Sequence, residues 1–96
     1  MFEVRQTDEY ARWFKNLRDS AARARILVRI RRLSLGNPGD VQPVGEGVSD
    51  MRIDYDPGYR VYYKRVNETL VVLLAGGDKD SQRRDVEKAK MLAREL

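Results

Sequence analysis

Residues Thr69–Ala75 form the most apolar stretch of the chain, and two glycines, Gly76 and Gly77, follow it. A strand that is apolar at successive positions buries both of its faces, so this stretch predicts a strand in the interior of a sheet. The chain has 96 residues, which leaves no room for a second core. We therefore expect one domain, residues 1–96, built around this strand.

Two hairpins are predicted around the strand Tyr59–Val66. The preceding strand, Val48–Tyr55, alternates apolar and polar residues and is followed by Asp56-Pro57-Gly58. Proline presets φ in such a turn, and glycine allows a positive φ. On the other side, Asn67-Glu68 is expected to form the tip of the hairpin that leads into the apolar strand.

Two helices are predicted near the N-terminus. Thr7 is a good N-cap, and the apolar residues that follow recur at helical spacing: Tyr10, Trp13, Phe14 and Leu17. Asp19 and Ser20 interrupt this pattern. A second apolar stripe then consists of Ala22, Ile26, Ile30 and Leu33. The short break predicts that the two helices form an antiparallel hairpin.

The remaining segments complete the expected fold. Phe2–Gln6 alternates weakly and predicts a short first strand, whereas residues 37–47, rich in proline and glycine, predict a loop. A last helix is expected after Asp80 or Ser81. The order is β-α-α-β-β-β-α, which defines an α/β (α+β) protein with two N-terminal helices packed on a small, mainly antiparallel sheet and a C-terminal helix.

Composition limits the chemistry of the chain. It has no cysteine and no histidine, and its net charge is +4. A disulfide framework and thiolate metal sites are excluded, and acid–base chemistry must use other residue types. No apolar run reaches transmembrane length, so a cytoplasmic protein without a membrane partner is expected. A basic chain attracts nucleic acid or an acidic protein, and net charge does not distinguish them.

The predicted strand after the turn carries cations and aromatics in alternation. Arg60, Tyr62 and Lys64 fall on one face, whereas Tyr59, Val61 and Tyr63 fall on the other. A cationic and aromatic face is suited to holding a phosphodiester backbone and stacking bases. Lys64, further along the strand, is also explained as an ordinary surface residue.

Three cations could converge at one end of the sheet. Arg60 follows the turn, Arg52 lies on the preceding strand, and Lys79 follows the apolar strand. Each also has an ordinary structural explanation. Arg60 could pair with Asp54 or Asp56 across the hairpin, and Lys79 could be a solvated lysine near a helix start, where the helix dipole disfavours it.

The chemistry open to these residues is metal-independent RNA cleavage. A ribose 2′-hydroxyl would attack the adjacent phosphate, and cations would stabilise the developing charge. Arginine suits that role because its planar fork binds phosphate through two donors. Lys79 or Tyr62 could act as base or acid, but only if neighbouring cations lower its pKa. No cofactor is expected.

Two other charged sets are open to two explanations. The second helix carries arginines around its apolar stripe, which indicates either a solvated face or a surface for nucleic acid or a partner. The acidic residues Asp50, Asp54 and Asp56 could suggest a metal site. The absence of histidine and the role of Asp56 in the turn favour the interpretation without metal.

Several segments together resemble a known family. They are GVSDMRIDYDPGYRVYY, LVVLLAGGDKDSQ and DVEKAKMLARE, with an early W-F-x-x-L helix and the segment R-I-x-R-L-x-x-G-N-x-G-D. The chain resembles the RelE/HigB-like toxins of bacterial type II toxin–antitoxin modules, in the phage-derived "addiction module killer protein" branch. PGYRVYY and GGDK are the most specific elements, and the resemblance covers nearly the whole chain.

The resemblance implies ribosome-dependent cleavage of mRNA and neutralisation by a cognate antitoxin, typically a helix-turn-helix protein through which the complex binds operator DNA. Arg60 matches the strand arginine that contacts the scissile phosphate. Lys79 matches the basic residue after the last central strand, and Arg52 falls near the basic positions of the preceding strand. Tyr62 is a further candidate on the face of Arg60.

Two other functions remain compatible with the sequence. The related ParE class shares the implied fold but poisons DNA gyrase without cutting RNA. A non-catalytic nucleic-acid-binding module is the second alternative, with the arginines of the second helix on phosphate groups. Its affinity would fall steeply with salt.

Overall fold

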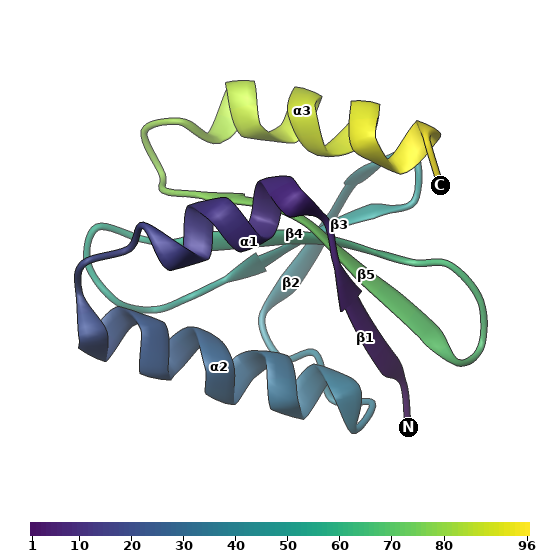
Figure 1. Ribbon diagram of the computed structural model, residues 1–96, viewed down its shortest axis with the longest axis horizontal. Coiled ribbons are helices and arrows are strands. Elements are labelled where there is room, and N and C mark those ends of the chain that lie inside the picture. Colours follow the sequence, from purple (N-terminus) through teal and green to yellow (C-terminus); the bar gives the residue numbers. More distant parts are fainter.

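The computed structural model describes residues 1–96 as one five-stranded sheet with three helices (Figure 1). In chain order the elements are β1 (Glu3–Gln6), α1 (Asp8–Lys15), α2 (Ser20–Ser34), β2 (Val41–Gly45), β3 (Val48–Arg52), β4 (Arg60–Arg65), β5 (Leu70–Gly77) and α3 (Gln82–Arg94). The strands lie in the order β1-β5-β4-β3-β2; β1 is parallel to β5, and the other neighbours are antiparallel. The predicted α+β class and the order of the predicted elements are confirmed.

One strand was not predicted. Residues 37–47 were expected to form a loop, but Val41–Gly45 within them forms β2 at the edge of the sheet. Its register places Val41 opposite Met51 and Pro43 opposite Ser49, and it shifts between Pro43 and Gly45. Proline and glycine are tolerated here because an edge strand needs hydrogen bonds on one side only. The proline and glycine residues that predicted a loop are therefore compatible with an edge strand.

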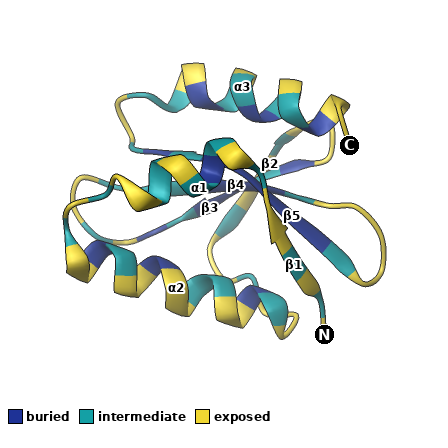
Figure 2. Ribbon diagram, viewed as in Figure 1, coloured by how far each residue is buried: buried dark blue, intermediate teal, exposed yellow.

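The helices form layers on the two faces of the sheet (Figures 1 and 2). On the face of α1 and α2, the buried side chains of Tyr10 and Ile26 pack with Val61 and Leu73. On the face of α3, Tyr62, Val72, Leu74 and Ala89 form a second core. Strand β5 contributes to both cores and lies between β1 and β4, which confirms the prediction that it is an interior strand. None of the helices is long and apolar enough to cross a bilayer.

Side-chain caps start the first two helices. The hydroxyl of Thr7 accepts a hydrogen bond from the Tyr10 amide (3.0 Å) and donates one to the carbonyl of Leu74 (2.6 Å). The carboxylate of Asp19 accepts the amides of Ala21 (3.0 Å) and Ala22 (3.2 Å) and the hydroxyl of Tyr55 (3.0 Å). These contacts satisfy amides that a helix start leaves without partners. They also join α1 to β5 and α2 to the β3–β4 connection.

The Asp19 contacts predict an acid-dependent loss of stability. Amide and hydroxyl donors hold the pKa of Asp19 below its ordinary value of 3.8, so the unfolded state binds more protons at low pH. The contribution of ionised Asp19 to the free energy of unfolding is therefore fully present above pH 3.8, and it is lost as the pH falls toward the lowered pKa. Asp19→Asn keeps a good N-cap but cannot titrate, so its unfolding midpoint should depend less on pH below 4. Thermal unfolding of both proteins across that range checks this, and identical pH profiles would contradict it.

Gly76 and Gly77 occupy positions that admit no side chain. A Cβ at Gly76 would overlap the ring of Trp13, and one at Gly77 would overlap the carboxylate of Asp85. The end of β5 can therefore pass between α1 and the start of α3 only with glycine at both positions. This close approach places the β5–α3 loop beside the turn that precedes β4.

Replacement of Gly76 by alanine should lower the free energy of unfolding by about 3 kcal/mol, because the indole ring of Trp13 must be displaced from a packed position. Gly36→Ala is the matched control. No atom lies within 4 Å of a Cβ at Gly36, and the cost there is limited to its positive φ of 92°, about 1 kcal/mol. Urea unfolding measures both values, and equal losses would contradict the close packing of Trp13 on Gly76.

Candidate functional site

Arg52 and Arg60 lie side by side at one end of the sheet. They are directly opposite each other in the β3–β4 register, and Gly77 of β5 is the other neighbour of Arg60. A guanidinium nitrogen of Arg60 donates to Oδ2 of Asp50 at 2.7 Å, and Nε of Arg52 lies 3.9 Å from the same oxygen. The Asp50 side chain is 1% exposed and that of Arg60 is 13% exposed. One buried carboxylate therefore holds two cations.

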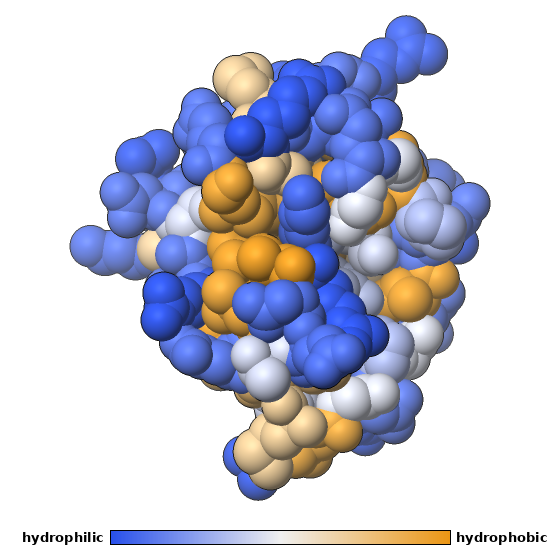
Figure 3. All heavy atoms as spheres, turned by 90° about the vertical axis from the view of Figure 1, so that its right-hand side faces the viewer, coloured by the Kyte–Doolittle hydropathy of each residue, from blue (hydrophilic) through white to orange (hydrophobic).

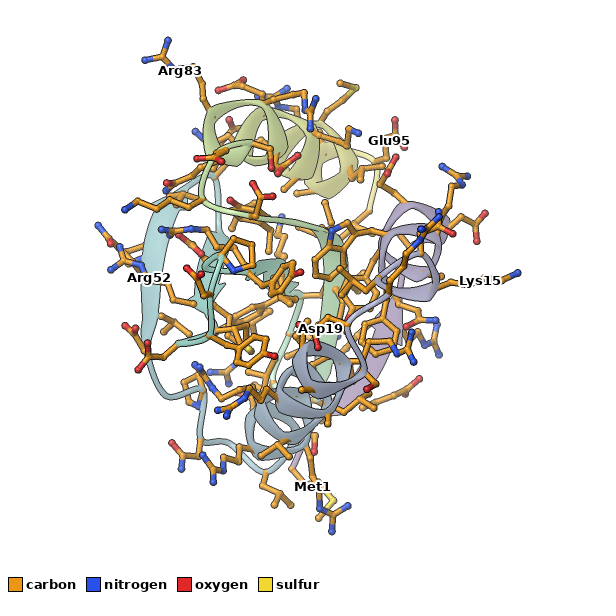
Figure 4. All side chains as sticks on the ribbon, turned by 90° about the vertical axis from the view of Figure 1, so that its left-hand side faces the viewer. Met1, Lys15, Asp19, Arg52, Arg83 and Glu95 are labelled. Atoms are coloured by element: carbon orange, nitrogen blue, oxygen red, sulfur yellow. The ribbon has the colours of Figure 1, made fainter.

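The two arginines differ in their access to solvent. The Arg52 side chain is 42% exposed, donates a hydrogen bond to the side chain of Gln42 on β2, and points outward from the sheet (Figure 4). The Arg60 side chain is mostly covered. The Nε atoms of both arginines are buried without a hydrogen-bond partner, so the difference lies in the rest of the side chain, of which Arg52 exposes more.

Lys79 lies on the exposed loop between β5 and α3. A Cβ at Gly58 would lie 3.6 Å from the Cβ of Lys79, so this lysine borders the turn that precedes Arg60. The loop is held by Asp78, whose Oδ1 accepts the amides of Asp80 (2.9 Å) and Ser81 (3.1 Å). We call Arg52, Arg60 and Lys79 the cationic surface. The structure places Arg52 and Arg60 next to each other, and it places the loop of Lys79 beside the turn that leads to Arg60.

A hollow of about 250 Å³ lies at the cationic surface. Its lining includes Arg52, Arg60, Gly58 and Tyr59; the other lining residues are Asp40, Ile53 and Asp54. The Tyr59 ring itself packs edge-on against Trp13 of α1, with 6.3 Å between the ring centres. Two guanidinium groups at one hollow can bind a phosphate through directed N–H donors. The acidic residues of the rim reduce the local positive potential.

Tyr62 is not part of this accessible surface. Its side chain is completely buried under α3, its hydroxyl has no hydrogen-bond partner, and it lies opposite Asp50 in the sheet. Burial, together with the carboxylates of Asp50 and Asp85, raises the pKa of Tyr62 above its ordinary value. The lowered pKa that acid–base chemistry would require is therefore absent. A catalytic role for Tyr62 would require α3 to leave the sheet.

The predicted alternation of β4 is confirmed, but the accessible aromatic face is not found. Val61 and Tyr63 lie in the core under α1 and α2, whereas Tyr62 lies in the core under α3. Lys64 contacts the β2–β3 turn, where its Cε would lie 3.3 Å from a Cβ at Gly47. The face of Arg60 is thus covered by α3 over most of its length. Only the rim that carries the cationic surface remains accessible.

Asp50 is the residue that the sequence analysis did not identify as a partner of Arg60. The expected partners were Asp54 or Asp56, but both are exposed, and the salt bridge of Arg60 is made to Asp50. The alternation of β3 contains the signal, since Val48, Asp50 and Arg52 point to one face of the strand. An acidic residue between a buried valine and an arginine on that face is placed to pair with cations.

Fold and site together define a small α+β protein in which a buried aspartate holds two arginines at one end of the sheet. Over 94 residues the chain is 45% identical to an uncharacterized protein of Haemophilus influenzae (strain ATCC 51907 / DSM 11121 / KW20 / Rd), a match that covers 98% of this chain and 95% of the relative. The chain belongs to the same family as this H. influenzae protein. No protein-family model and no solved structure matches the chain.

Proposed function

We propose that the chain is the toxin of a type II toxin–antitoxin module, and that it acts in the cytoplasm by cleaving mRNA on the ribosome. The observation that supports this proposal is the cationic surface, because Arg52 and Arg60 are neighbours across two strands and Lys79 borders the turn that leads to Arg60. Asp50 offsets one of these charges, and Asp40 and Asp54 in the lining of the hollow offset part of the rest, so the directed N–H donors of the arginines rather than net charge would hold a phosphate. A phosphodiester is the substrate class that such a rim favours.

In the proposed reaction a ribose 2′-hydroxyl attacks the adjacent phosphorus. A new P–O2′ bond forms, the P–O5′ bond breaks, and the 5′-oxygen leaves with a proton. Arg60 contacts one carboxylate oxygen and keeps further N–H donors for the phosphate, while Arg52 adds charge from the neighbouring strand. Both stabilise the charge that develops on the phosphate oxygens. Lys79 is the exposed group best placed to exchange a proton with the attacking or leaving oxygen.

The pairing with Asp50 serves positioning in this proposal. A guanidinium that is fixed in the sheet does not have to be ordered when RNA binds, and such positioning accounts for a large part of the rate of many enzymes. The antitoxin is expected to neutralise the toxin by covering this rim, since opposite charge would cancel the field that attracts RNA.

Expression of the chain without its neighbouring gene tests the proposal in cells. The expected result is growth arrest, with new 5′ ends inside coding sequences and unchanged gyrase supercoiling activity. Co-expression of the neighbouring gene product should restore growth. The control is a variant in which Arg52 and Lys79 are both alanine, since both side chains are accessible and can be removed without opening the core.

Three outcomes would contradict the proposal. Arrest with intact messages and inhibited gyrase would indicate a gyrase poison. Binding to nucleic acid without arrest, weakened by salt and by single arginine losses alike, would indicate a non-catalytic module. No arrest from the folded wild-type protein would exclude a toxin.

A further inference from the structure

Helix α2 exposes apolar residues on the side that faces away from the sheet. Its inner side is buried through Ala22, Ile26 and Leu33. Leu27 and Val28 are nevertheless 54% and 50% exposed, and Leu35 at the C-cap is 54% exposed. With Ala24 these residues follow helical spacing along the outer side, which Figure 2 shows as largely exposed. We call Ala24, Leu27, Val28 and Leu35 the outer stripe.

This concentration of exposed apolar residues is unusual within the molecule. The outer stripe contains three of the seven large apolar side chains that are exposed; the other four are Met1, Val66, Met91 and Leu96. On the side of the molecule drawn in Figure 3, hydrophilic residues surround the apolar areas. A surface helix normally places polar residues on its outer side, and a grouped apolar stripe is typical of a binding surface.

A hollow of about 410 Å³ borders the outer stripe where α2 approaches the end of β3. Ala24, Val28 and Ile53 provide its apolar lining, and arginines form much of its rim. Arg29 is fixed there, since its guanidinium donates to the backbone carbonyls of Arg52, Pro38 and Asp40. The guanidinium of Arg25 lies 4.7 Å from the centre of the Tyr55 ring. The rim is thus held in place by contacts within the chain.

The charge of α2 indicates the chemistry of the partner. The helix carries five arginines and no acidic residue; they are Arg23, Arg25, Arg29, Arg31 and Arg32. A nucleic acid would satisfy the arginines but would leave the apolar side chains of Leu27 and Val28 in water. An acidic amphipathic helix satisfies both, because its apolar side covers the stripe and its carboxylates reach the arginines.

We infer that the outer stripe binds an acidic, amphipathic helix of a protein partner, and that this partner is the antitoxin. The identity of the partner rests on the proposed function. The stripe from Ala24 to Leu35 is about 16 Å long, which corresponds to about three turns of a partner helix. Ile53 and Asp54 line both this hollow and the hollow at the cationic surface. An acidic segment that continues from the stripe would therefore arrive at Arg52 and Arg60 and block access of RNA.

Affinity measurements with the neighbouring gene product test this inference. In the stripe variant Leu27 and Val28 are both replaced by serine, and in the charge variant Arg32 is replaced by glutamate. The affinity of the full chain should fall at least about 30-fold in the stripe variant and clearly in the charge variant. Met91→Ser is the matched control, because Met91 is 55% exposed on α3, on the other face of the sheet. It should leave the affinity within twofold.

The outcomes test the docking surface on α2 separately from the toxin–antitoxin function. A tight complex that both variants leave unchanged would overturn the docking surface and leave the toxin–antitoxin module intact. If the wild-type chain forms no complex with the neighbouring gene product, both are overturned. A wild-type chain that dimerises alone and becomes monomeric in the stripe variant would identify a second copy as the occupant. Loss of binding to a single-stranded RNA oligonucleotide in the stripe variant, with partner binding intact, would identify RNA.

Discussion

Replacement of Asp50 by alanine should lower the free energy of unfolding by about 3–5 kcal/mol, a large fraction of the stability of a small domain. Asp50 is 1% exposed, and its carboxylate contacts Arg60, of which the side chain is 13% exposed. Removal of the carboxylate leaves a guanidinium without its counter-charge in a mostly dry position. Urea unfolding, followed by circular dichroism, measures the loss.

Two control variants show whether the pair is the cause. Asp54→Ala removes an exposed carboxylate from the connection that follows β3, and it should change the free energy of unfolding by less than about 0.5 kcal/mol. The double variant Asp50→Leu with Arg60→Met replaces both charges by apolar groups and should recover much of the loss. An Asp50→Ala protein as stable as Asp54→Ala would contradict a buried pair between Asp50 and Arg60.

Arg60→Gln should lower the rate of mRNA cleavage at least about 100-fold, because it removes the charged donor that the proposed reaction places at the scissile phosphate. Asp50→Asn is the informative partner of this variant. It perturbs the same buried contact but keeps the guanidinium of Arg60, and it removes the charge that offsets that cation. The amide oxygen of an asparagine can still accept a hydrogen bond from Arg60 and so preserve part of its positioning. Asp50→Asn should therefore lose much less activity than Arg60→Gln under conditions in which both proteins are folded, as checked by circular dichroism.

If both variants lose activity equally, Arg60 has a structural role in the sheet and no role in binding the phosphate. The comparison is needed because the loss of activity in an Arg60 variant alone combines two effects, the loss of a phosphate contact and the loss of a buried salt bridge. A mostly covered arginine in a salt bridge stabilises the fold whether or not it also contacts RNA.

The interior position of β5 could be predicted because a strand that is apolar on both faces must be covered on both faces. The run Thr69–Ala75 has no polar face, so helices had to cover it on both sides, and β5 indeed contributes to both cores. The turn at Asp56-Pro57-Gly58 was equally determined by local chemistry, and Gly58 adopts the expected positive φ of 89°. Strand β2 could not be predicted, because an edge strand tolerates the proline and glycine that normally indicate a loop.

The sequence predicted which cations lie at this end of the sheet, but it did not predict which side chains there are buried. Strand alternation placed Arg60 and Tyr62 on one face, but it does not say which residues α3 covers. The position of α3 depends on contacts distant in sequence, such as the packing of Ala89 with Val48 and Tyr62 and the salt bridge of 2.8 Å between Arg94 and Glu46. These contacts bury Tyr62 and leave Lys79 exposed. As a result, only the edge of the expected open face is accessible.

Cleavage of an mRNA bound to purified ribosomes tests the central claim most directly. The wild-type chain should cut the message within the decoding site, and the variant with alanine at both Arg52 and Lys79 should be slower by at least about 100-fold. Lys15→Ala removes an exposed cation of α1 on the other side of the molecule (Figure 4), and this variant should cut at the wild-type rate. An uncut message with the folded wild-type chain, or equal cleavage by the wild type and the Arg52/Lys79 variant, would contradict a nuclease site at the cationic surface.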